Sequence, residues 1–205
     1  IASGLTLYAW EQYDISGTLE GVYASVIDKT SGAVFQSATL IGATAINPRC
    51  LAIGPNPTLF YLDTSSSPYV MKSVQVNTLN PVVFNSTTTI VSTVNTTNPF
   101  YDVAVNSSNA TSGNAAFVYN SSSSTTIGVG FITTDGVAGT PGNGFTSVTT
   151  IGSTDAADLL TLTVDQVNTA PTETDRLYVG YASTTAGQGL KIKRIKSVLT
   201  VEATH

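Results

Sequence analysis

The chain has 205 residues, a formal net charge of −5 and a charged fraction of only 10%. Its 8 Lys and Arg residues are too few to neutralise a row of phosphates, which argues against nucleic acid as a partner. With one Cys, and with its one His at the C-terminal position, the sequence offers neither a disulfide framework nor a Cys/His metal site, so we expect no metal and no cofactor.

The composition favours strands over helices. Hydrophobic residues make up 41% of the chain, and most are Val, Ile, Leu, Tyr and Phe, which suit strands. The good helix formers Glu, Lys, Gln, Met and Arg are scarce. No apolar run reaches the roughly 18 residues of a membrane-spanning helix. We therefore expect an all-β protein with no membrane span.

Alternating apolar and polar residues predict short strands along the whole chain, in four successive groups. The first group has three strands, and each later group has four. The predicted strands are 5–10, 19–27 and 33–41; 47–53, 57–62, 69–76 and 82–90; 98–105, 115–119, 126–132 and 144–151; and 157–164, 176–181, 190–195 and 198–201.

The four groups repeat one another. The aromatic residues at the matching position of each group are 52, 57 and 61 residues apart, and they are Tyr8, Phe60, Phe117 and Tyr178. Four short antiparallel strands repeated at this spacing are typical of the blades of a β-propeller. A β-sandwich does not repeat an order of four strands, and a parallel β-helix has shorter repeats. The sequence therefore favours propeller blades.

The repeats divide the chain into a partial blade at 1–45 and full blades at 46–97, 98–154 and 155–205. Together they form one propeller domain or part of a larger one. The first repeat lacks its inner strand, and an unpaired sheet edge rich in Val and Ile invites association with another chain. We therefore expect the chain to be a segment of a larger protein or one part of an assembly.

The first repeat resembles the propeller repeats of bacterial secreted proteins and of tailed-bacteriophage tail proteins of the nozzle and adhesion type. A Trp-bearing strand at 7–14 (LYAWEQYD) precedes a strand at 21–28 (GVYASVID) and a Gly-containing turn at 32–35 (GAVF). Trp10 has no counterpart in the other three repeats. The resemblance implies a blade with a structural role and implies no catalytic residue.

Aromatic residues of the first repeat are candidates for glycan binding, because aromatic faces suit pyranose rings. The candidates are Trp10, Tyr13 and Tyr23, with Tyr13 in a turn. The alternative, which we favour, is that Tyr8 and Trp10 share one side of a strand and fill the space between neighbouring blades.

A second candidate surface is basic. Half of all the Lys and Arg residues stand close together, at Lys191, Lys193, Arg194 and Lys196. Lys191 and Lys193 alternate with apolar residues, so they share one face of a strand. They are candidates for contact with an acidic partner or with lipopolysaccharide phosphates. The alternative is that Lys side chains on an outer strand prevent unwanted strand pairing.

The acids and the thiol have structural interpretations. Four acids stand in or near turns, where their side chains are expected to accept hydrogen bonds from the backbone: Asp14, Asp28, Asp63 and Asp135. Cys50 lies in an apolar run and is expected to be a buried, inert thiol. No pair of acids stands out for glycoside hydrolysis.

We therefore expect a virion structural protein, a propeller component of a bacteriophage tail that forms a wall or a host-facing platform. Its partners are other protein chains of the assembly, and it is not expected to be an enzyme. The alternative is a secreted or cell-surface propeller that binds host-surface glycans. A glycoside-processing enzyme on the same scaffold is the least favoured possibility.

Overall fold

The computed structural model describes residues 4–53, 56–77, 83–105, 115–122, 126–132, 149–150, 157–165, 176–183, 189–196 and 201–204. Every regular element in these ranges is a β-strand, so the predicted all-β class is confirmed. No helix in these ranges is long and apolar enough to cross a membrane.

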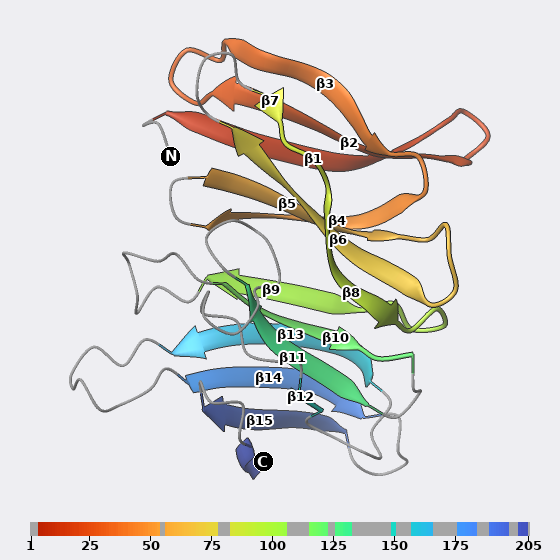
Figure 1. Ribbon diagram of the computed structural model, residues 1–205, viewed down its shortest axis with the longest axis vertical. Coiled ribbons are helices and arrows are strands. Elements are labelled where there is room, and N and C mark those ends of the chain that lie inside the picture. The colour runs from red at the N-terminus through yellow and green to blue at the C-terminus, as the bar shows by residue number, and fades with distance from the viewer. Residues whose placement is uncertain are drawn as a thin grey trace. The chain divides into compact units, whose positions relative to one another are not determined.

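The strands form four sheets, whose members follow one another along the chain (Figure 1). The first sheet has the order β1 (Leu5–Tyr13), β2 (Leu19–Asp28), β3 (Val34–Gly42). The second has the order β4 (Ala45–Ile53), β5 (Asn56–Asp63), β6 (Tyr69–Asn77), β7 (Val83–Phe84), and β8 (Thr88–Val94) also pairs with β6.

The third and fourth sheets are likewise built from consecutive strands. The third has the order β12 (Thr149–Thr150), β11 (Ile127–Ile132), β10 (Ala115–Asn120), β9 (Tyr101–Val105). The fourth has the order β13 (Ala157–Asp165), β14 (Arg176–Ser183), β15 (Leu190–Lys196), β16 (Val201–Thr204). The chain divides into two compact units, one with the first two sheets up to Ser92 and one with the last two from Thr93 on.

In the first unit the two sheets pack face to face. Leu7 pairs with Val26 and Ala9 with Ala24, so these four side chains share one face of the first sheet. That face packs on a group of buried residues from the second sheet, namely Ala45, Leu59, Tyr61 and Val74. Each large side chain buried in this way stabilises the fold by about 1.5–3 kcal/mol.

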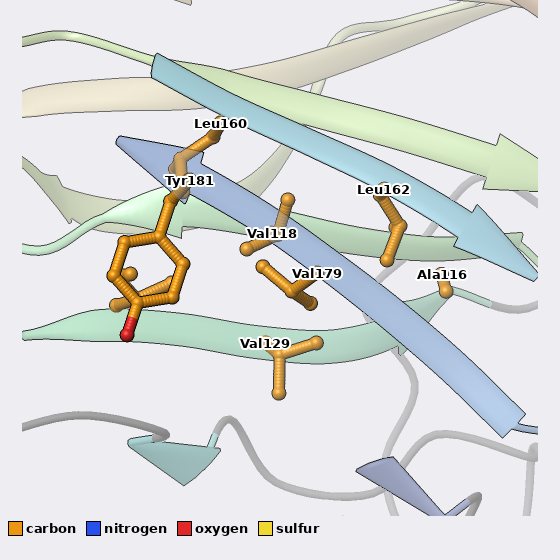
Figure 2. Close-up of a cluster of buried hydrophobic side chains, with 8 residues drawn as sticks. Ala116, Val118, Val129, Leu160, Leu162, Val179 and Tyr181 are labelled. Atoms are coloured by element: carbon orange, nitrogen blue, oxygen red, sulfur yellow. The ribbon is translucent and has the colours of Figure 1, made fainter. Parts of the chain in front are cut away.

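The second unit repeats this arrangement with the third and fourth sheets (Figure 2). The third sheet contributes buried residues from β10 and β11, and the fourth contributes buried residues from β13 and β14. They are Ala116, Val118, Ile127, Val129, Leu160, Leu162, Val179 and Tyr181. Tyr181 is completely buried, so this pair of sheets has a closed apolar core of its own.

The predicted strand at 82–90 is wrong in one respect, because the structure splits it. β7 ends at Phe84 and β8 begins at Thr88, and the polar residues 85–87 lie between them. Of the predicted strand at 144–151, only 149–150 lies within the described residues. A closed ring, the number of blades and the division at 45, 97 and 154 stay predictions.

Gly21 is required where β2 approaches the end of β3. Its φ is +128°, and a Cβ there would run into the backbone of Gly42 and Ala43. Gly32 also has a positive φ, of +72°, but nothing lies within 4 Å of a Cβ placed there. A side chain at either position would meet an unfavourable backbone conformation, but only a side chain at position 21 would also clash with neighbouring atoms.

We predict that Gly21→Ala lowers the free energy of unfolding by about 3 kcal/mol or more, since strain and overpacking add. Gly32→Ala, the matched control, should cost about 1 kcal/mol, because only the left-handed backbone is disfavoured. Urea unfolding followed by circular dichroism measures both. Equal losses in the two variants would show that β2 does not approach β3 as described.

Candidate functional site

The first sheet has a second face, which points away from the core of its unit. Tyr8 pairs with Ser25 and Trp10 with Tyr23, at the positions that alternate with the core residues of β1 and β2. Leu40 of β3 lies opposite Tyr23. We call this surface the open face; its members are Thr6, Tyr8, Trp10, Gln12, Tyr23, Ser25, Ile27, Val34 and Leu40.

The open face is apolar and aromatic, and none of its members is charged. Trp10 and Tyr23 stack across the strands, with ring centroids 6.2 Å apart and an interplanar angle of 19°. Tyr8 is 50% exposed, Val34 61% and Leu40 46%. Exposed apolar side chains therefore gather on this face, whose other members, Thr6, Gln12 and Ser25, are polar.

Tyr8 and Trp10 share one side of β1, as predicted, but this side does not face the second sheet, since Leu7 and Ala9 do so. That they fill the space beside another blade stays a prediction. The sequence signal that we missed is that the strand at 5–10 is apolar on both faces, as is the strand at 19–27. A strand with one solvated face alternates apolar and polar residues, whereas two apolar faces indicate two partners.

Tyr13 does not join the aromatic pair. Its hydroxyl donates a 2.6 Å hydrogen bond to Oε2 of Glu11, and Oε1 of Glu11 accepts the backbone N–H of Asn47 at 2.6 Å. The hydrogen bond to the Glu11 carboxylate raises the pKa of Tyr13 above its usual value. Of the three predicted glycan-binding residues, the structure therefore brings together Trp10 and Tyr23 and places Tyr13 with Glu11.

The margin of the open face is polar. Nε2 of Gln12 donates a 2.6 Å hydrogen bond to Oε2 of Glu20, beyond the end of the row formed by Tyr8 and Trp10. The aromatic residues are therefore bordered by an amide on β1 and a carboxylate on β2, which are groups that can bond to hydroxyls.

The basic residues of β15 are placed differently from the prediction. Lys193 is only 8% exposed, and its Nζ lies 5.6 Å from the centroid of the Tyr181 ring, within reach of a cation–π interaction. Leu190 and Ile192, by contrast, are 71% and 44% exposed. Lys193 is thus part of the protein's interior and not of a solvent-facing stripe.

β15 is also not an outer strand, because β16 pairs with it on the side away from β14. The alternative that its Lys residues protect a sheet edge is therefore wrong. Lys191 and Arg194 are partly exposed, and the side chain of Lys196 lies outside the described residues. A partner contact by these residues stays a prediction.

The turn acids that the structure describes behave as expected, and Asp135 lies outside the described residues. Oδ1 of Asp14 accepts hydrogen bonds from Ser16 and Thr18, which lowers the pKa of its carboxyl. Oδ1 of Asp28 accepts the backbone N–H groups of Ser31 and Thr30, with the same effect on its pKa. These carboxylates hold turns together and are not arranged for proton transfer.

Asp63 is the most strongly bonded acid in the first unit. Burial disfavours its charged form, but hydrogen bonds from Lys72 at 2.6 Å, Ser65 at 3.0 Å and Thr44 at 2.7 Å outweigh that effect. The pKa of Asp63 therefore lies well below its usual range, and the same contact raises the pKa of Lys72.

Because the pKa of Asp63 is depressed in the folded state, its contribution to stability is present above about pH 4 and is lost as pH falls below that value. We predict that Asp63→Asn is less stable than the unchanged protein by about 1.5–3 kcal/mol at pH 6. The difference should shrink towards pH 2. Urea midpoints across this range measure it, with Glu20→Gln as the control at an exposed carboxylate; a pH-independent difference would contradict the assignment.

Cys50 lies on β4. The residue as a whole is exposed to solvent, so the prediction that it is buried is wrong. It lines a cavity of about 380 Å³ together with Leu5, Leu7 and Pro57. Desolvation in this apolar setting raises the pKa of the Cys50 thiol to about 11. At neutral pH the thiol is protonated and weakly nucleophilic, so this cavity holds no activated nucleophile.

Comparison with known proteins gives little. No family model matches the sequence, and no curated protein matches it either. A solved structure, a mutant of the Synechocystis apocarotenoid oxygenase, matches over 91% of this chain with 10% sequence identity and a TM-score of 0.38. This chain spans only 44% of that one.

The matched structure is an enzyme, and this finding corrects our expectation that the chain is not an enzyme. At this identity and TM-score the match assigns no reaction, substrate or cofactor to the chain.

Proposed function

We propose that the chain is a structural component of a larger β-sheet assembly, and that the open face is the surface on which a neighbouring sheet packs. The observation that carries this proposal is the contrast between the two faces of the first sheet. One face is covered by the second sheet, and the other carries Tyr8, Trp10 and Tyr23 with no charged side chain.

The packing inside the chain supports this proposal. In both units an apolar sheet face is covered by another sheet, which is a common way to remove such a face from water in an all-β protein. The open face has the same kind of side chains. It is therefore suited to the same kind of neighbour.

The assembly that we propose is a bacteriophage tail, in which the chain contributes to a wall or a host-facing platform of the virion. This part of the proposal is supported by the resemblance of residues 7–14, 21–28 and 32–35 to the blades of such tail proteins. The low charged fraction of 10% also suits a surface that is covered by neighbours.

Trp10 is the only Trp of the chain, so its fluorescence reports on the open face alone. We predict that raising the protein concentration from about 1 μM to about 1 mM produces association, because the contact is small. Trp10 emission should then shift to shorter wavelength as water leaves the face. Sedimentation and fluorescence together measure this.

Tyr8→Arg should suppress both effects, because it places a charge on the open face. Thr96→Arg, the same charge at an exposed turn residue, is the control and should behave as the unchanged protein. A monodisperse monomer at 1 mM would contradict the proposal, and so would association without a change in Trp10 emission.

Glycan binding is a second candidate, favoured by the Trp10–Tyr23 stack with Gln12 and Glu20 beside it. Pyranose rings place an apolar face on aromatic rings and bond to polar groups at their edges. Trp10→Ala and Tyr23→Ala should then each weaken binding of soluble oligosaccharides at least tenfold. Tyr13→Ala should leave it unchanged, because Tyr13 contacts Glu11 instead. Titration calorimetry against a panel of oligosaccharides tests this, and no binding by the unchanged protein excludes it.

A further inference from the structure

The first sheet lacks a strand that each of the other sheets has. In the second, third and fourth sheets the first strand along the chain, β4, β9 or β13, pairs antiparallel with the strand that follows it. The first sheet begins with β1, which matches these following strands in the sequence repeat and pairs with β2. Among the described residues no strand pairs with the other edge of β1, so that edge is open to a further strand.

The cavity that Cys50 lines, of about 380 Å³, lies along this edge. Four consecutive residues of the chain line it, from Gly4 to Leu7. Successive side chains of a strand point to opposite faces, so consecutive residues meet at one cavity only where it borders the edge of the strand. None of the described residues of β2 lines the cavity, which places it on the side of β1 away from β2.

The second sheet is open to solvent at the same place. Cys50 pairs with Leu59 and Ala52 with Pro57, so these four residues share one face of the second sheet. This face packs on the first sheet, since Leu59 belongs to the core that Leu7 contacts. Leu59 and Pro57 are buried there, whereas Cys50 and Ala52 are exposed. This end of β4 therefore faces the first sheet and yet is not covered by its described residues.

The second unit shows what covers the corresponding strand. There β9 pairs with β10 of the third sheet and also packs on β13 of the fourth. Ala104 of β9 packs against the core that contains Leu160 and Leu162, each 6% exposed. Oδ2 of Asp102, also on β9, accepts a hydrogen bond from the backbone N–H of Leu162 at 2.9 Å. One strand thus extends its own sheet and covers the first strand of the next.

We propose that the edge of β1 binds an extended strand of another protein chain, which fills the cavity and covers Cys50 and Ala52 as β9 covers β13. The described strands of this chain are all paired in their own sheets, so we assign the added strand to a partner. The inference goes beyond the proposed function, because it concerns the edge of the first sheet and not the open face.

The cavity defines the chemistry of the partner strand. It runs antiparallel to β1, as β4, β9 and β13 run relative to the strands that follow them. Its side chains towards the cavity are small and apolar, because Leu5, Leu7 and Leu51 line that space. Its C-terminal end lies beside Gly4 and Lys29, where an acidic residue is favoured.

A peptide of residues 99–105 of this chain, which contains β9, is a suitable probe. Cys50 is the one Cys of the chain, so its alkylation by N-ethylmaleimide, followed by mass spectrometry, reports on the cavity. With the protein at about 10 μM, about 1 mM peptide should slow this alkylation at least about threefold, because a single added strand binds weakly.

Two pairs of modified peptides test the geometry. In the register of β9 on β10, Ala104 faces the cavity and Val103 the opposite side. Ala104→Glu in the peptide should abolish the slowing, since it puts a charge into an apolar space, and Val103→Glu should retain it. Of two peptides N-methylated at residues 101, 103 and 105 or at 102 and 104, one alone should lose the effect, because successive N–H groups point to opposite edges. Equal behaviour within either pair would overturn the inference, as would no slowing by the unmodified peptide.

Variants of the protein locate the site. Ala52→Glu should abolish the slowing, and Thr96→Glu, the same charge at an exposed turn, should not. Leu40→Arg changes the open face away from β1 and should leave the slowing unchanged, so this inference and the proposed function can fail separately. If a higher protein concentration without peptide slows the alkylation instead, β1 pairs with a second copy, which would overturn the assignment to a different partner.

Discussion

The whole structure depends on the alternation of side chains along a β-strand. Successive side chains point to opposite faces of a sheet, so a sheet that packs on one neighbour still has a second face. In each unit one pair of faces is closed, by Leu59 and Val74 against the first sheet and by Leu162 and Val179 against the third. On the face of the first sheet that remains, Tyr8 is 50% exposed.

Several charged side chains lie where hydrogen bonds hold them. Asp14 and Asp28 lie in turns, where backbone N–H groups hold their carboxylates, and Asp63 is held by Lys72 and two hydroxyl-bearing residues. Lys193 differs from these acids, since it lies inside the protein over the Tyr181 ring. A buried ammonium is tolerated there because the aromatic face offsets part of its lost hydration.

The positions of the strands could be predicted from the sequence. The face of a sheet to which each side chain points could not. The strands at 5–10, 57–62 and 190–195 were predictable, because period-two alternation and turn residues are local signals. The sequence did not show that Leu7 and Ala9 face the second sheet and that Tyr8 and Trp10 do not. Lys193 was expected to face solvent, and Cys50 was expected to be buried. When both sides of a strand carry apolar residues, the sequence does not say which side meets the neighbouring sheet.

The sequence by itself determined that this is an all-β protein of short repeated strands, because strand propensity, alternation and turn chemistry all act within a few residues. Only the tertiary structure decided that Leu7 and Ala9 enter the core while Trp10 and Tyr23 stack outside it. The physical reason is that the choice of face depends on contacts between residues far apart in the chain, which no local pattern encodes.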